Sequence, residues 1–246
     1  MNNVGTTAIR SSGPLFSNNT IKQRAELVQR FALFSEVPLD ECAKIVALAH
    51  EARFPQGRAI FFAGDSLRQT ALLTSGCAKL SQSDREGEEV ILRLVGPGEM
   101  LCVECFPKYN HCSTAWAVQP STALVWETGQ FQAFAERFPS LARNVSCILM
   151  KTLTQLEVRF REISTEKVAL RLSSQLLRLI DQLGKSWVGH IEISLSQRDL
   201  AQLTGTTLFT VNRLLSQWEQ MGIVKPRRES LQILNAQALK ELAQAE

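Results

Sequence analysis

Arg213 belongs to a group of hydrogen-bonding side chains that recur along one predicted helix, together with Thr207, Thr210 and Asn212. A guanidinium can donate two parallel hydrogen bonds to the O6 and N7 atoms of a guanine, and threonine hydroxyls can reach phosphates or bases. The start of this helix carries no acidic residue that would repel phosphates. These residue types and their spacing are typical of a helix that lies in a major groove with its N-terminal side chains on base edges.

The elements that must position this helix lie within residues 193–228, which predict a helix, a tight turn, a second helix and a basic hairpin. Ser196 is expected to cap the first helix, and Asp199 at the third helical position completes a capping box. Gly205 is expected to end that helix. Thr206 or Thr207 can then cap the second helix.

A buried stripe and a set of cations complete the pattern. In the second helix the apolar residues fall close to the i, i+3, i+4, i+7 spacing of a buried face, at Val211, Leu214, Leu215 and Trp218. Gly222 ends this helix, and cations follow where a winged fold touches the DNA backbone. The expected DNA contacts are Ser196, Gln197, Thr206, Thr207, Thr210, Asn212, Arg213, Gln217, Lys225, Arg227 and Arg228. The alternative is a helical hairpin packed inside any α-rich domain.

This stretch resembles the winged helix-turn-helix of the CRP/FNR family of bacterial transcription regulators. The matching residues read TTLFTVNRLLSQWEQMGIV, and Arg213 corresponds to the family's base-reading arginine. Phe209 departs from the family, because many members carry a glutamate there that reads a cytosine. The resemblance implies a homodimeric regulator, activator or repressor, that binds a palindromic operator in double-stranded DNA and works with RNA polymerase. It implies no enzymatic activity.

Length and composition limit the number of domains and the classes of protein that are possible. A chain of 246 residues suits one large or two ordinary domains, and its formal net charge of +3 is too small to indicate nucleic acid by itself. No apolar run approaches the length of a membrane span, and the N-terminal residues lack a signal-peptide core. We therefore expect a cytoplasmic protein without membrane association. Residues 1–20, rich in Asn, Ser, Thr and Gly, are expected to form a disordered arm.

Short strands are predicted between Phe54 and Glu127, where aliphatic runs alternate with turn signals every 7 to 12 residues. The spacing resembles the cyclic-nucleotide-type β-roll of the same family, which assigns residues 21–138 to a sensor domain. The expected fold is α+β, with an N-terminal antiparallel, jelly-roll-like β-roll joined by a long dimerisation helix to a C-terminal winged helix-turn-helix.

The long helix is predicted over residues 139–163. Its apolar residues recur at alternating steps of four and three, which is the spacing of a coiled-coil seam, at Leu149, Leu153, Leu156, Phe160 and Ile163. A symmetric partner would cover this seam, although a helix packed on its own β-roll gives a similar pattern. Residues 164–246 are expected to form the DNA-binding domain, in which Ser164 or Thr165 caps the first helix.

The effector region is predicted in the segment MLCVECFPKYNHCSTAWAV, beginning at Met100. By the resemblance, Cys102 and Val103 replace the glycine and glutamate of the nucleotide-binding turn, and Ser113 or Cys112 replaces the arginine that pairs with the phosphate. A buried phosphate would lack its counter-charge, so cAMP is rejected as the effector; only a shifted cassette using Lys108 would restore it. The expected pocket residues are Cys102, Glu104, Cys105, Ser113 and Thr114.

Cysteines are unusually frequent in this segment. The ligand set Cys102, Cys105, His111 and Cys112 could hold zinc or an iron centre, or could sense oxidants as thiolates. The cofactor is therefore left open among a metal, an iron–sulfur cluster and haem. No cofactor, with reduced thiols lining a small apolar pocket, carries equal weight.

Two other classes of protein share parts of this pattern. The Cys102-x-x-Cys105 spacing raises a thiol-disulfide oxidoreductase, but the thioredoxin-like βαβ unit that usually carries such a motif is missing. The weak net charge and Phe209 raise a ligand-sensing regulatory module that does not bind DNA. Selection of bound sequences from random duplex DNA would separate the latter from a regulator.

Overall fold

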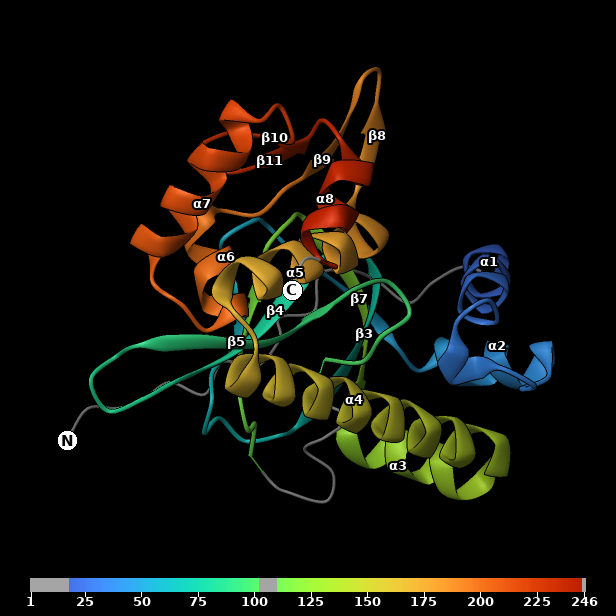
Figure 1. Ribbon diagram of the computed structural model, residues 1–246. Coiled ribbons are helices and arrows are strands. Elements are labelled where there is room, and N and C mark those ends of the chain that lie inside the picture. The colour runs from blue at the N-terminus through green and yellow to red at the C-terminus, as the bar shows by residue number, and fades with distance from the viewer. Residues whose placement is uncertain (1–17, 102–109, 245–246) are drawn as a thin grey trace. The chain divides into compact units, whose positions relative to one another are not determined.

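The computed structural model describes residues 18–101 and 110–244, and their contacts divide the chain into two compact units (Figure 1). The first unit comprises residues 1–82 and 93–154, and the second comprises residues 83–92 and 155–246. The predicted arm over residues 1–20 lies mostly outside the described residues. Its last residues are helical, because α1 begins at Asn18.

Short helices open the first unit. The helix α1 spans Asn18–Val28, the 3₁₀ helix η1 spans Ala32–Phe34 and α2 spans Leu39–Ala47. The strands follow as β1 His50–Phe54, β2 Ala59–Phe61, β3 Gln69–Ser75, β4 Ala78–Ser83, β5 Glu89–Val95, β6 Thr114–Ala117 and β7 Ser121–Glu127. The helix α3 spans Thr128–Arg137, and the long helix α4 spans Pro139–Thr165.

These strands form two antiparallel sheets with the orders β1-β7-β3 and β2-β6-β4-β5. Alternate residues of a strand point to opposite faces, and β7 uses both of its faces. Ala123 and Val125 belong to the core that also holds residues of β2, β4 and β6. Leu124 and Trp126 belong to a second core, formed with the N-terminal helices, α3 and the start of α4. The expected α+β fold with an antiparallel β-roll is thus confirmed.

Trp126 joins the helices to the sheet by a specific bond. Its indole Nε1 donates to the carbonyl of Ile45 at 2.8 Å, and the side chain is fully buried. The turn before β4 requires glycine, since Gly76 has φ +84° and a Cβ there would lie 2.4 Å from the carbonyl oxygen of Pro120. The Trp126 bond and the close approach of Gly76 to Pro120 each join segments that are far apart in the sequence.

The second unit contains the winged helix-turn-helix. Its helices are α5 Val168–Leu183, α6 Gln197–Thr204, α7 Leu208–Gln220 and α8 Ala236–Leu242. One antiparallel sheet has the order β10-β11-β9-β8, formed by β8 Lys185–Trp187, β9 His190–Ile193, β10 Val224–Pro226 and β11 Leu231–Ile233. The hairpin residues 83–92 cluster with these elements.

The predicted cap of α5 was wrong. The long helix continues through Thr165, and the hydroxyls of Ser164 and Thr165 donate back to the carbonyls of Phe160 and Arg161, both at 2.8 Å. Inside a helix these side chains bond the preceding turn instead of opening a new helix. The N-cap residue of α5 is Lys167, which makes no side-chain capping bond.

None of the helices in the described residues combines the length and the apolar content that crossing a membrane requires.

Candidate nucleic-acid interface and effector region

Local capping fixes the start of α6. The Ser196 hydroxyl accepts a hydrogen bond from the Asp199 backbone N–H at 3.1 Å, and the Asp199 carboxylate accepts one from the Ser196 backbone N–H at 3.2 Å. The predicted capping box is therefore confirmed. Because the Ser196 hydroxyl also donates to Asp199 at 2.6 Å, a DNA phosphate would have to share it.

A tight turn separates α6 from α7. Gly205 ends α6 in the left-handed conformation with φ +60°, as glycine permits without steric cost. Of the two predicted caps of α7, Thr207 is the one used, since its hydroxyl accepts from the backbone N–H of Thr210 at 3.2 Å. The two threonine hydroxyls also lie 2.9 Å apart, so they are hydrogen-bonded to each other in the free protein.

The helix α7 has one buried and one exposed face. Val211, Leu214, Leu215 and Trp218 are buried, as the spacing predicted. The exposed residues of α7 include Asn212, Arg213 and Gln217 among the predicted contacts, together with Phe209 and Ser216. Among the described residues no carboxylate pairs with Arg213. The guanidinium is therefore available to a ligand.

The wing is the turn between β10 and β11. Its backbone is closed by a hydrogen bond from the Arg227 N–H to the Ser230 carbonyl at 2.8 Å, and the Ser230 hydroxyl donates to Glu192 of β9 at 2.8 Å. Lys225, Arg227 and Arg228 are exposed. Figure 1 shows this hairpin beside α7, so both predicted contact surfaces are carried by neighbouring elements.

An exposed cation on α6 was absent from the predicted contacts. Arg198 lies in the first turn of α6, next to Gln197. Its sequence signal was a positive charge directly after the N-cap Ser196, on the helix that precedes α7. The structure thus adds one basic side chain to those exposed on the helix-turn-helix.

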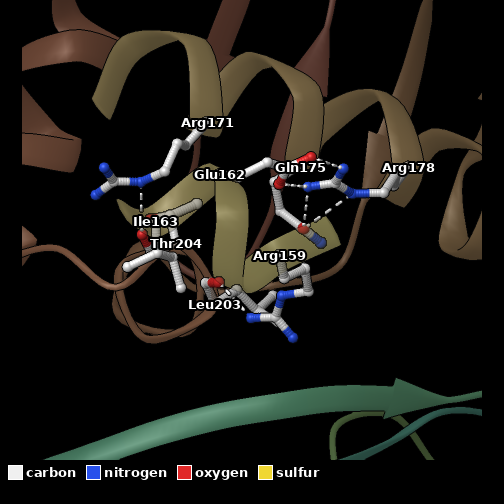
Figure 2. A pocket seen from close by; sticks show the side chains of 8 residues that line it. All are labelled: Arg159, Glu162, Ile163, Arg171, Gln175, Arg178, Leu203 and Thr204. Atoms are coloured by element: carbon white, nitrogen blue, oxygen red, sulfur yellow. Dashed lines mark hydrogen bonds and ion pairs between the residues drawn. The ribbon is translucent and has the colours of Figure 1, made fainter. Parts of the chain in front are cut away.

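Arginines of α4 and α5 line a pocket next to the C-terminal end of α6 (Figure 2). Arg178 of α5 donates to both carboxylate oxygens of Glu162 of α4 at 2.8 Å, and Glu162 is buried. Arg171 of α5 donates to the carbonyls of Thr204 at 3.2 Å and Gly205 at 3.4 Å. These bonds fix the C-terminal end of α6 relative to α5, and thereby the turn before α7.

Arg159 of α4 makes a third set of such bonds. Its guanidinium donates to the carbonyls of Leu203 at 2.6 Å, Ile91 at 3.1 Å and Leu92. Burial lowers the pKa of Arg159, and so does Arg178 nearby, while Glu162 opposes the shift. Gln202 of α6 also donates to the Glu89 carboxylate at 2.9 Å. The hairpin 83–92 is therefore bonded to α4 through Arg159 and to α6 through Gln202.

The predicted effector region is only partly described. Cys102, Glu104 and Cys105 lie outside the described residues. Ser113 is buried directly before β6, and the Thr114 hydroxyl of β6 accepts from the Ala63 backbone N–H at 3.1 Å. The two described pocket residues thus lie at the start of β6, the strand that pairs with β2.

His111 and Cys112 are the described members of the predicted metal set. The His111 ring is buried and stacked on Phe61 with 3.7 Å between ring centroids. Burial lowers the pKa of His111 to about 4, which Asp65 opposes, so the imidazole is neutral near pH 7. Cys112 packs against the core between the sheets. The described residues contain no group of three potential metal ligands, and the four-ligand site stays a prediction.

Cys42 is expected to be chemically silent in the folded protein. Burial raises its thiol pKa from 9.0 to about 11, with smaller contributions from Asp40 and Glu41, while a backbone hydrogen bond opposes the shift. At pH 8 the thiolate fraction falls roughly 100-fold, and the thiolate is the reactive species. Peptide mapping after timed alkylation should show Cys42 labelled at least that much more slowly in native than in unfolded protein. Exposed Cys147 is the internal control, and equal native labelling of both would contradict the assignment.

Comparison with known protein families finds two domain models that match this chain. Residues 51–138 match the cyclic nucleotide-binding domain, and residues 170–242 match the Crp-like helix-turn-helix domain. Together the two matches cover the β-roll and the winged helix-turn-helix described above. The chain thus pairs a cyclic nucleotide-binding domain with a helix-turn-helix domain.

Several known regulators align with most of this chain. The cyclic AMP receptor protein of Thermus thermophilus is 27% identical over 213 residues, which is 86% of this chain and 96% of the relative. The fumarate and nitrate reduction regulatory protein of Yersinia pestis is 21% identical over 211 residues, 85% of this chain and 84% of the relative. The structure of FixK2 from Bradyrhizobium japonicum has a TM-score of 0.70 at 20% identity, covering 80% of this chain and 98% of that one.

The chain combines a cyclic nucleotide-binding domain with a Crp-like helix-turn-helix domain, and its relatives are regulators of the CRP/FNR type. It is a DNA-binding regulator built from a cyclic nucleotide-binding domain and a Crp-like helix-turn-helix.

Proposed function

We propose that this regulator acts as a homodimer on a palindromic operator, with α7 of each subunit in a major groove and each wing on the DNA backbone. The observation that carries the proposal is the exposed, acid-free N-terminal part of α7, which presents Arg213 without a carboxylate partner among the described residues. Side chains in this position of a groove helix contact base edges. The wing cations would bind phosphates, which orient the protein without reading sequence.

Dimerisation is supported by the exposed apolar residues of α4. Leu153 is 51% exposed, Leu156 39%, Phe160 75% and Ile163 43% within the single chain. Large apolar side chains recurring along one helix are unfavourable in water, and a second copy would bury them. Leu149, the first residue of the predicted seam, is partly buried against its own helical core. The proposed interface therefore centres on Leu153 and the residues that follow it.

The effector is proposed to be a signal other than cAMP. Ser113 is buried at the place where the family resemblance expects the arginine that pairs with the nucleotide phosphate. A serine hydroxyl supplies no counter-charge, and burying an unpaired phosphate is costly. The cysteine-rich segment 102–112 is the proposed location of the response, either through a bound metal or through thiol oxidation. Contact with RNA polymerase, in activation or repression, is part of the same proposal.

The deciding experiment is selection of bound duplexes from a random DNA library by the full-length protein. The proposal expects enrichment of a palindrome whose half-site centres lie about 34–36 Å, one helical turn, or a multiple of that distance apart. Enrichment of a single asymmetric site would contradict the dimeric arrangement. Binding of all duplexes without enrichment would contradict base reading by α7.

Arg227→Ala should weaken binding to selected and unrelated duplexes by similar factors. Arg227 lies in the wing, where its charge would neutralise a phosphate and release counterions. The logarithm of affinity against the logarithm of salt concentration should therefore lose about one unit of slope per subunit. Fluorescence anisotropy over a series of salt concentrations measures both effects.

A matched control for this variant is Arg161→Ala. Arg161 is an exposed arginine of α4 that pairs with Glu166 at 2.8 Å, outside the proposed contact surface. Its removal should leave the salt slope unchanged. If Arg227→Ala altered sequence preference instead of the slope, the wing would have to be assigned to base contacts.

A further inference from the structure

Phe209 is a large apolar side chain that the fold leaves outside its core. It lies in the first turn of α7 and is 77% exposed, while the buried stripe of that helix is formed by other residues. Burying a phenyl ring removes a large apolar area from water, and the free energy gained stabilises the contact that buries it. The ring is therefore free to contribute this free energy to an intermolecular contact.

The position of Phe209 on α7 aligns it with the proposed base-reading residue. Phe209 precedes Arg213 by four residues, a spacing that places two side chains on the same helical face. The two residues are separated by about 6 Å along the helix axis, at 1.5 Å per residue. This distance corresponds to roughly two base-pair steps of 3.4 Å. A groove helix that places Arg213 on a guanine would hold Phe209 over a neighbouring base pair.

The chemistry of the major groove leaves few partners for a phenyl ring. The base edges there present hydrogen-bond donors and acceptors, which an aromatic hydrocarbon cannot satisfy, and the C5-methyl group of thymine is the apolar feature. Contact between these two apolar groups removes both from water. A base pair without the methyl group would instead lose hydration of its polar atoms beneath the ring.

We propose that Phe209 is a specificity-determining residue that contacts the C5-methyl group of a thymine within about two base pairs of the guanine bound by Arg213. The inference rests on the proposed function, because it requires α7 to lie in the major groove. It goes beyond that function by assigning the class of base that this chain reads beside the guanine.

Replacing single thymines with uracil tests the contact directly. Uracil pairs like thymine and lacks only the methyl group, so the experiment uses the duplex selected by the parent protein and exchanges one thymine at a time. Each half-site should contain one thymine whose exchange for uracil weakens binding about 4-fold, the equivalent of about 0.8 kcal/mol for one buried methyl group. Exchange in both half-sites together should weaken binding about 15-fold.

Variants of Phe209 identify the residue responsible. Phe209→Ala should bind the thymine and uracil duplexes with equal affinity, whereas Phe209→Leu should retain part of the difference. Phe209→Glu should shift the preferred base at this position toward cytosine, whose N4 amino group donates to a carboxylate. Trp187→Ala is the control for loss of an exposed aromatic side chain, since Trp187 is 60% exposed on the β8–β9 hairpin, and it should keep the thymine preference.

The outcomes separate this inference from the function on which it rests. Equal binding of thymine and uracil duplexes by the parent at every position would overturn the inference and leave sequence-specific binding intact. A thymine preference that survives in Phe209→Ala would overturn it as well. If the parent selected no sequence at all, the proposed function would fail, and the inference would fail with it.

Discussion

A Leu153→Asp, Leu156→Asp double variant is expected to be monomeric at concentrations where the parent is a dimer. The two leucines lie in the proposed seam of α4 and are 51% and 39% exposed in the single chain. In a dimer the substitutions would bury unpaired carboxylates at a cost of several kcal/mol. Light scattering or sedimentation measures the change of mass.

The same variant should lose most of its affinity for the operator. Two linked DNA-binding units bind adjacent half-sites with a high effective concentration, which a monomer lacks. Because both positions are exposed in the single chain, the variant should keep its helical content, measured by circular dichroism. Gln155→Asp, at an exposed polar position of the same helix, is the control for added charge. A double variant that stays dimeric would move the interface to another surface.

Arg213→Ala should have the largest effect among single substitutions on the proposed DNA surface. A bidentate contact between arginine and guanine contributes roughly 1–3 kcal/mol, or about 5- to 150-fold in affinity per subunit. In a symmetric dimer the loss occurs twice. Selection from random duplexes should also show relaxed preference at the guanine position, because the variant no longer distinguishes its acceptor pattern.

Arg213→Lys separates charge from geometry at this position. Lysine keeps the positive charge but cannot reproduce the planar pair of donors. We expect it to recover binding to unrelated duplexes and only part of the preference for guanine. If Arg213→Ala bound the selected duplex as tightly as the parent, α7 would not lie in the groove in the proposed way.

Local features of the helix-turn-helix were predictable because their causes lie within a few residues. The capping box of Ser196 and Asp199, the left-handed Gly205 and the cap at Thr207 depend on neighbouring backbone groups. The buried stripe of α7 follows from helical periodicity. The antiparallel β-roll was likewise indicated by regularly spaced turns and by the family resemblance, which the domain comparisons confirm.

The predictions failed or stopped where distant groups decide the structure. Ser164 and Thr165 are residue types that often cap helices, but the long helix continues through Thr165, and their hydroxyls bond to carbonyls of its preceding turn. The carbonyl partners of Arg159 are 44, 67 and 68 residues away, so no periodicity could reveal them. The effector region depends on residues brought together by several loops, and sequence spacing alone could not assign its ligand.

The discontinuous second unit has a consequence for the order in which this protein folds during synthesis. The hairpin residues 83–92 leave the ribosome well before Arg159 and Gln202, whose bonds hold them in the finished unit. Strand β5 lies at the edge of its sheet, and an edge strand with unpaired backbone groups can pair with another chain. The nascent β-roll therefore lacks the bonds from Arg159 and Gln202 to this hairpin until α4 and α6 have been made. An isolated fragment that stops after α3 would lack these bonds permanently.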